Sequence, residues 1–142
     1  MDSHIDKSQI SNHLVNLSSQ KKIALIVDDE LFMTELLSNI LSKLGYQCIT
    51  AGNGQDAIAL FITLVDKGTS CSLVLMDLTL PGSTDGSQII LEMKKIDSSF
   101  KSVALSGYSD SPILKKPHVF GFDSALSKPF RKAELIGVLA NL

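Results

Sequence analysis

Short apolar runs alternate with longer amphipathic segments along most of the chain. Runs rich in β-forming residues predict strands over 23–27, 46–50, 72–76, 101–105 and 124–127. Apolar residues spaced three and four positions apart predict helices over 31–44, 55–67, 86–96, 110–116 and 131–141. Nearly continuous apolar strands that alternate with helices are typical of a parallel sheet buried on both faces. The sequence therefore predicts an α/β domain with a doubly wound, five-stranded parallel sheet and helices on both faces.

The first 20 residues differ in composition from the rest of the chain. They are rich in Ser, Asn, Gln, Asp and His, and Lys21-Lys22 leads abruptly into the first apolar run. We therefore predict a polar leader or linker over 1–20 and one domain over 21–142, since a chain of 142 residues is too short for two independent cores. Within the leader, Ile10, Leu14 and Leu17 are spaced as in a short helix.

Charge and composition exclude several classes of protein. With 13 basic and 15 acidic residues the net charge is -2, which offers nucleic acid no attractive field. No apolar run approaches the ~20 residues that span a bilayer, and the polar start lacks a secretory hydrophobic segment. We expect a cytoplasmic protein that contacts no membrane through this chain. Cys48 and Cys71 lack the neighbouring Cys or His of a zinc site, and we predict both to be buried thiols.

Polar side chains that could take part in a reaction follow the predicted strands. Asp28-Asp29-Glu30 follows the first strand and Asp77 follows the third. Ser106 ends the fourth, and Lys128 follows the fifth. Because ligands of open parallel sheets bind beyond the carboxyl ends of the strands, we expect these side chains to converge on one rim.

Three carboxylates held close together repel one another unless a cation neutralises them, and an all-oxygen set of ligands suits Mg²⁺. A carboxylate between Mg²⁺ and a lysine can attack a phosphoryl group, which gives an aspartyl phosphate. Each residue alone also has a plain structural interpretation, because an Asp after a strand often caps a helix. The hypothesis depends on the joint pattern.

Four motifs carry a resemblance to a known family: Val27-Asp28-Asp29-Glu30, Leu75-Met76-Asp77-Leu78 with Leu80-Pro81, Ala104-Leu105-Ser106-Gly107, and Lys128-Pro129-Phe130. In order and spacing they resemble the motifs of response-regulator receiver domains, over about residues 21–142. The resemblance implies the flavodoxin-like receiver fold. It also implies a signalling phosphoacceptor of two-component phosphorelays, which catalyses at most its own phosphotransfer and dephosphorylation and is not otherwise an enzyme.

The resemblance assigns roles by position. It makes Asp77 the phosphoacceptor and a metal ligand, Asp29 a direct ligand of Mg²⁺, and Asp28 a ligand through water. The backbone carbonyl of Thr79 is expected to be a further ligand.

Ser106 takes the place of the hydroxyl that turns toward the phosphoryl group, and Lys128 that of the paired lysine, with a cis bond expected before Pro129. The implied partner is a sensor histidine kinase or a histidine phosphotransfer domain. The segments 106–110 and 121–123 are most similar to the C-terminal receivers of hybrid sensor histidine kinases. The sequence leaves open whether the chain stands alone or belongs to such a kinase. It also does not identify the cognate kinase, the stimulus, the output or the oligomeric state.

The chain departs from the family pattern at two places. Ala125 stands three residues before Lys128, where the family often has a switch Tyr or Phe, so activation must proceed without an aromatic swing. Gly82-Ser83-Thr84 also lengthens the loop beside Asp77 by one residue.

Three other functions compete with that of a receiver. The stretch from Gly52 to Ala57 fits a dinucleotide-binding pattern, but it follows the second strand and leaves Asp28, Asp29 and Lys128 unexplained. An aspartyl phosphatase would need an acid where Thr79 stands. The remaining alternative is a receiver-like interaction module that is never phosphorylated.

Overall fold

The computed structural model describes residues 22–80 and 85–142. The strands are β1 (Lys22–Val27), β2 (Tyr46–Ala51), β3 (Cys71–Asp77), β4 (Lys101–Ser106) and β5 (Ser124–Ser127). The helices are α2 (Leu31–Lys43), α3 (Gly54–Asp66), α4 (Gly86–Ile96), α5 (Pro112–Lys115) and α6 (Lys132–Ala140), with a 3-10 turn, η1, at Pro117–Phe120. The leader, its helical spacing and the lengthened loop at 82–84 lie outside the described residues.

All five strands are parallel and form one sheet in the order β2-β1-β3-β4-β5. This confirms the predicted doubly wound sheet. The strand order reverses between β1 and β3, where Val27 lies opposite Met76. The residues that follow these two positions, Asp28 and Asp77, are therefore brought side by side at the topological switch point, where such sheets bind their ligands.

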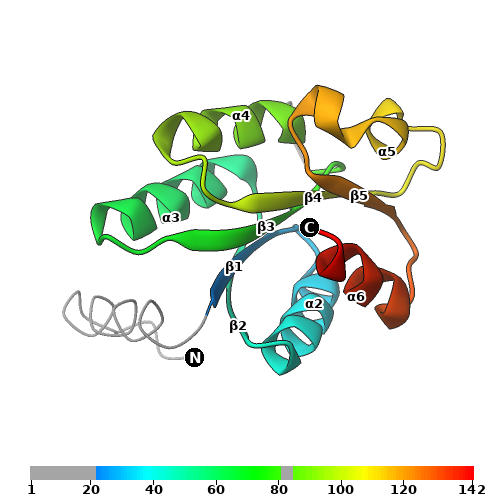
Figure 1. Cartoon of the computed structure of the whole chain (residues 1–142), viewed down its shortest axis with the longest axis horizontal. Coiled ribbons are helices and arrows are strands. Elements are labelled where there is room, and N and C mark those ends of the chain that lie inside the picture. Colours follow the sequence, from blue (N-terminus) through cyan, green and yellow to red (C-terminus); the bar gives the residue numbers. More distant parts are fainter. Residues whose placement is uncertain (1–21, 81–84) are drawn as a thin grey trace.

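Helices cover both faces of the sheet (Figure 1). α3, α4 and α5 pack on one face around Phe61, Met93 and Phe100, and α2 and α6 pack on the other around Leu37 and Leu135. Successive strand residues point to opposite faces, so the middle positions of the central strands, 23–27 and 73–76, are all apolar. In the part of the chain that the structure describes, no helix is long and apolar enough to cross a membrane.

The helix predicted over 110–116 is shorter than expected. α5 spans only Pro112–Lys115, and a separate 3-10 turn begins at Pro117. Ser111 caps α5 because its side chain accepts a hydrogen bond from the backbone N–H of Ile113. Proline disfavours helical geometry in the preceding residue, and Lys116 accordingly has φ -138° and ψ 70°. Pro112 and Pro117, five residues apart, therefore divide this connection into two short turns.

The prediction that both cysteines are buried holds for Cys71 and is wrong for Cys48, which is only half-buried. Cys48 lies on β2, an edge strand, so one side of it has no neighbouring strand among the described residues. Burial raises the pKa of the Cys71 thiol to about 12, and it also raises the pKa of Cys48.

We expect the two thiols of the folded protein to react at different rates. At pH 8 a thiol of pKa about 12 is ionised to only about one part in 10⁴, and the thiolate is the species that alkylates. Iodoacetamide should therefore label Cys48→Ser, which retains Cys71, at least tenfold more slowly than Cys71→Ser, which retains Cys48. Mass spectrometry measures both labelling rates. As the control, the two variants should be labelled at equal rates in denaturant. Equal rates in the native state would contradict the deeper burial of Cys71.

Candidate functional site

Three carboxylates meet at the carboxyl ends of β1 and β3. Asp28 and Asp29 follow β1, Asp77 is the last residue of β3, and one oxygen from each lies within 4.8 Å of the others. Asp28 and Asp77 are buried, whereas Asp29 is exposed. The structure thus brings together the three acids that the sequence predicted as a metal site.

Asp28 is held by backbone groups on two sides. Its own N–H donates to the carbonyl of Ala51 at 3.0 Å, which continues the pairing of β1 with β2 past the end of the strand. Its Oδ1 accepts from the N–H of Glu30 at 2.9 Å, in the turn that starts α2. The first acid of the motif therefore fixes the loop that carries the second, Asp29.

Lys128 bridges the two buried acids. Its Nζ lies 3.1 Å from Oδ2 of Asp28 and 3.3 Å from Oδ1 of Asp77. The backbone N–H of Lys128 donates to the carbonyl of Ser106 at 2.7 Å, and its bond to Pro129 is cis, as expected. Burial by itself lowers the pKa of Lys128, but the hydrogen bond to Asp28 and the charge of Asp77 outweigh it, so the pKa is raised. The lysine is therefore charged at neutral pH.

The two oxygens of Asp77 have different surroundings. Oδ1 accepts from the backbone N–H of Thr79 at 3.0 Å and from its hydroxyl at 2.8 Å, in addition to its contact with Lys128. Among the described residues, none donates a hydrogen bond to Oδ2. Asp77 is thus anchored through Oδ1, whereas Oδ2 has no donor among the described residues.

Sequence reasoning missed the side chain of Thr79, which it considered only for its backbone carbonyl. Thr79 fixes the rotamer of Asp77 through two hydrogen bonds to one oxygen. An Asp followed two residues later by a hydroxyl residue is a local signal for such a turn and was present in the sequence.

Ser106 ends β4 beside this cluster, and its side chain is engaged locally. Its Oγ accepts from the N–H of Tyr108 at 3.1 Å and lies 3.3 Å from the carbonyl of the same residue. Ser106 is almost completely buried. In this state the hydroxyl holds the loop that leads to α5 and makes no hydrogen bond to Asp77.

The donor set fits a hard divalent cation. Among the described residues, the three carboxylates have one paired ammonium, that of Lys128, which contacts Asp28 and Asp77, and this leaves an excess of negative charge in a largely buried place. Carboxylate oxygens are the ligands that Mg²⁺ takes in proteins, and the exposed Asp29 leaves a side of the cluster open to water. Asp28, Asp29 and Asp77 are therefore able to hold such an ion.

Comparison with known proteins agrees with this arrangement. Residues 24–140 match the family model of the response regulator receiver domain. The chain belongs to this family. It is thus a receiver domain of two-component signalling systems, a class of signalling proteins, and the predicted resemblance is confirmed.

The chain is 33% identical over 106 residues to sporulation initiation phosphotransferase F of Bacillus subtilis, which covers 75% of this receiver and 81% of that protein. It is 30% identical over 119 residues to the chemotaxis protein CheY of Thermotoga maritima, covering 83% and 94%. A CheX-CheY-BeF3-Mg²⁺ complex from Borrelia burgdorferi shares the fold, with a TM-score of 0.73 at 22% identity over 84% of this chain and 87% of that one. The receiver spans only 45% to 50% of the length of other curated relatives.

We expect removal of the bridging ammonium to destabilise the receiver. In metal-free buffer, Lys128→Met should lower the free energy of unfolding by about 3 kcal/mol, because two buried carboxylates lose their counter-charge. Urea denaturation measures this. Adding Asp28→Asn should recover part of the loss, whereas strictly additive effects of the two substitutions would show that the charges are not coupled.

Proposed function

We propose that this receiver accepts a phosphoryl group from a phosphohistidine onto Asp77, with Mg²⁺, and signals through the conformational change that follows. The observation that carries the proposal is the asymmetry of Asp77: Thr79 and Lys128 hold Oδ1, while no described residue donates to Oδ2. A carboxylate oxygen free of donors keeps its lone pairs for nucleophilic attack.

The reaction transfers one group between two atoms. A bond forms between Oδ2 of Asp77 and phosphorus, and the bond between phosphorus and the histidine nitrogen breaks, so the electron pair of that bond returns to the imidazole. Lys128 lies within 3.3 Å of Oδ1 and supplies positive charge where the transferred oxygens gather. Asp28 orients that ammonium from its other side at 3.1 Å.

A magnesium ion would be held by Asp28, Asp29 and Asp77, with the backbone carbonyl of Thr79 as a further proposed ligand. When bound, Mg²⁺ supplies charge neutralisation for the phosphoryl oxygens and for the acids themselves.

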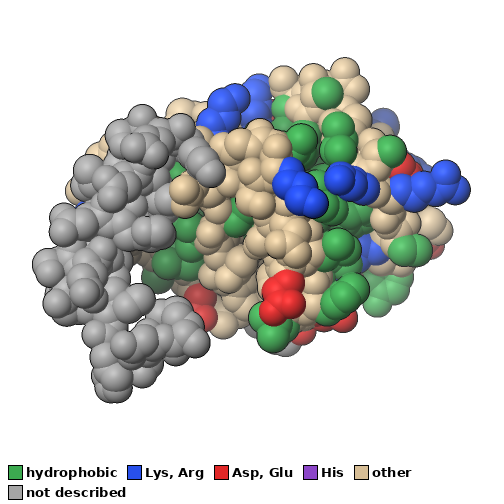
Figure 2. Space-filling view, turned by 90° about the horizontal axis from the view of Figure 1, so that it is seen from below, with side chains coloured by type: hydrophobic (Ala, Val, Ile, Leu, Met, Phe, Trp, Pro, Cys, Tyr) green, Lys and Arg blue, Asp and Glu red, His purple; other side chains and the backbone are tan. Residues whose placement is uncertain are grey.

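The partner is proposed to be a histidine kinase or a histidine phosphotransfer domain, and the cytoplasm remains the expected location. Leu31 and Phe32 begin α2 directly after the acids, and their side chains are 72% and 75% exposed. Figure 2 shows the face of the molecule that Figure 1 draws at the bottom, where hydrophobic side chains gather beside lysines and arginines. Exposed apolar residues next to a reacting group are suited to docking the protein that delivers it.

Signalling is proposed to begin at Ser106. Its hydroxyl must leave the backbone of Tyr108 in order to reach a phosphoryl group on Asp77. Ala125 is small and half-buried, so the response is expected to run through the loop after Ser106 and not through the residue on β5.

The central prediction is that Asp77 becomes phosphorylated. With acetyl phosphate and Mg²⁺, intact-mass measurement should detect one phosphoryl adduct that is absent from Asp77→Asn and absent in EDTA. Asp66→Asn, on an exposed turn of α3, is the matched control and should retain the adduct. A receiver that never gains the adduct, yet is folded, would support the alternative of an interaction module that is not phosphorylated.

Magnesium should stabilise the unphosphorylated receiver. A ligand that binds only the native state raises the melting temperature by mass action. Thermal melts in 10-fold steps of Mg²⁺ should show a progressive rise, which Asp29→Ala reduces or removes. If Asp29→Ala left this rise unchanged, Asp29 would not be a ligand.

The docking role of α2 predicts a selective loss of rate. Phe32→Ser should slow phosphotransfer from a phosphorylated partner at least tenfold, while acetyl phosphate, which needs no docking surface, should react at the original rate. Val119→Ser is the matched control, because Val119 is 72% exposed, close to the 75% of Phe32, but lies in η1. Equal slowing with both phosphodonors would place Phe32 in the chemistry and not in docking.

A further inference from the structure

The outer edge of β2 is an unprotected strand edge. β2 occupies one end of the sheet order, and among the described residues it pairs only with β1. Its six residues, Tyr46–Ala51, contain no charge and no proline, and its register with β1 is continuous without a bulge. Charges, prolines and bulges are the usual devices that prevent another chain from pairing with an edge.

The opposite edge of the sheet has such protection. β5 has only four residues, and the cis-linked Pro129 follows shortly after it. Short edge strands and proline both discourage pairing. The two edges of this sheet therefore differ, and only β2 presents a long, uninterrupted row of backbone groups.

The direction of these backbone groups follows from one hydrogen bond. The carbonyl of Ala51 accepts from the N–H of Asp28 and so points toward β1. Because successive residues of a strand point their N–H and C=O groups to alternate sides, those of Thr50 and Cys48 face the open side. Thr50 is also exposed.

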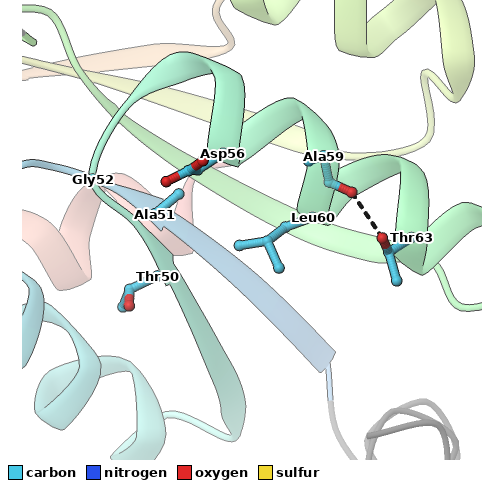
Figure 3. A pocket seen from close by; sticks show the side chains of 7 residues that line it. All are labelled: Thr50, Ala51, Gly52, Asp56, Ala59, Leu60 and Thr63. Atoms are coloured by element: carbon cyan, nitrogen blue, oxygen red, sulfur yellow. Dashed lines mark hydrogen bonds between the residues drawn. The ribbon is translucent and has the colours of Figure 1, made fainter. Parts of the chain in front are cut away.

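A hollow lies on each side of this edge. One, of about 400 Å³, lies between the end of β2 and α3, where Asp56 and Leu60 project toward it (Figure 3). The other, of about 420 Å³, lies against α2 and includes Glu35 and Ser38. Thr50 lines both hollows. In an added strand, consecutive side chains point to opposite faces, so one would enter each hollow.

The charge of the hollows selects the chemistry of the occupant. Asp56 is the one charged residue that lines the first hollow, and Glu35 is the one that lines the second, among the residues described. Both side chains are exposed acids. We propose that β2 is a docking edge for an extended, basic segment of another protein, which adds a sixth strand to the sheet and places consecutive basic side chains beside Glu35 and Asp56.

Asp77 lines neither hollow, and the proposal does not depend on its phosphorylation, although Leu31 of the proposed α2 docking surface also lines the second hollow. The probe is the fluorescent peptide acetyl-Thr-Val-Lys-Lys-Val-Thr-amide, whose two lysines point to opposite faces when it is extended. Its counterpart with Glu-Glu in place of Lys-Lys is the control. Fluorescence anisotropy with the full chain should show binding of the lysine peptide only.

Two variants test the position of the peptide. Glu35→Lys should weaken its binding at least tenfold, and Asp56→Asn should weaken it to a smaller extent. Glu92→Lys makes the same change of charge on an exposed position of α4, and it should leave the affinity within a factor of two. Equal loss in Glu35→Lys and Glu92→Lys would mean general electrostatic attraction, and would overturn the proposal.

Hydrogen exchange tests the pairing itself. The amides of Cys48 and Thr50 should exchange rapidly in the free receiver and at least tenfold more slowly with the peptide, whereas that of Ala51, which faces β1, should not change. Binding without this protection would overturn strand addition. Protection already present in the free receiver would also overturn the proposal, because the edge would then be covered. Protection that depends on protein concentration would indicate a second copy, and protection that does not would indicate another segment of this chain.

Discussion

Two carboxylates, Asp28 and Asp77, are buried side by side, and one lysine ammonium faces both of them at 3.1 and 3.3 Å. Burying an unpaired carboxylate is costly, so this arrangement requires that three distant segments of the chain meet accurately. The parallel register of β1 with β3 supplies the two acids, and the backbone bond of Lys128 to Ser106 supplies the lysine. The charge left over after this pairing is negative, and it is what makes the cluster able to hold a cation.

Much of this could be predicted from the sequence because the relevant signals are local. A strand buried on both faces is apolar at every position, and a polar residue directly after it must lie on the rim. Asp28, Asp77, Ser106 and Lys128 were therefore placed correctly at strand ends, and the acids were found to meet. The order of the strands requires more than pattern and was not predicted: the structure shows that it is β2-β1-β3-β4-β5, with the reversal between β1 and β3.

The features that escaped prediction depend on neighbours that the sequence does not name. The apolar spacing over 31–44 predicts one buried face, but only part of it is buried. Leu37 and Leu41 are buried, whereas Leu36 on α2 and Leu44 directly after it are 39% and 43% exposed. Cys48 is half-buried because its strand has a free edge. The split of the segment at 110–116 follows from Pro117, which disfavours helical geometry at Lys116 and so ends α5 at Lys115.

The distribution of burial also determines where a signal can travel at low cost. α5 and η1 contain no buried residue, and Tyr108, just after Ser106, is 66% exposed. Moving these turns exposes little apolar surface, whereas moving α3 or α4 would disturb Phe61 and Met93 in the core. In the proposed function, the Ser106 hydroxyl would exchange the backbone of Tyr108 for a phosphoryl group, and it would act there on a connection whose turns α5 and η1 contain no buried residue. Because few contacts change there, the free-energy difference between the two states is expected to be small, of about 1–3 kcal/mol, and a partner that binds only one state can shift the balance.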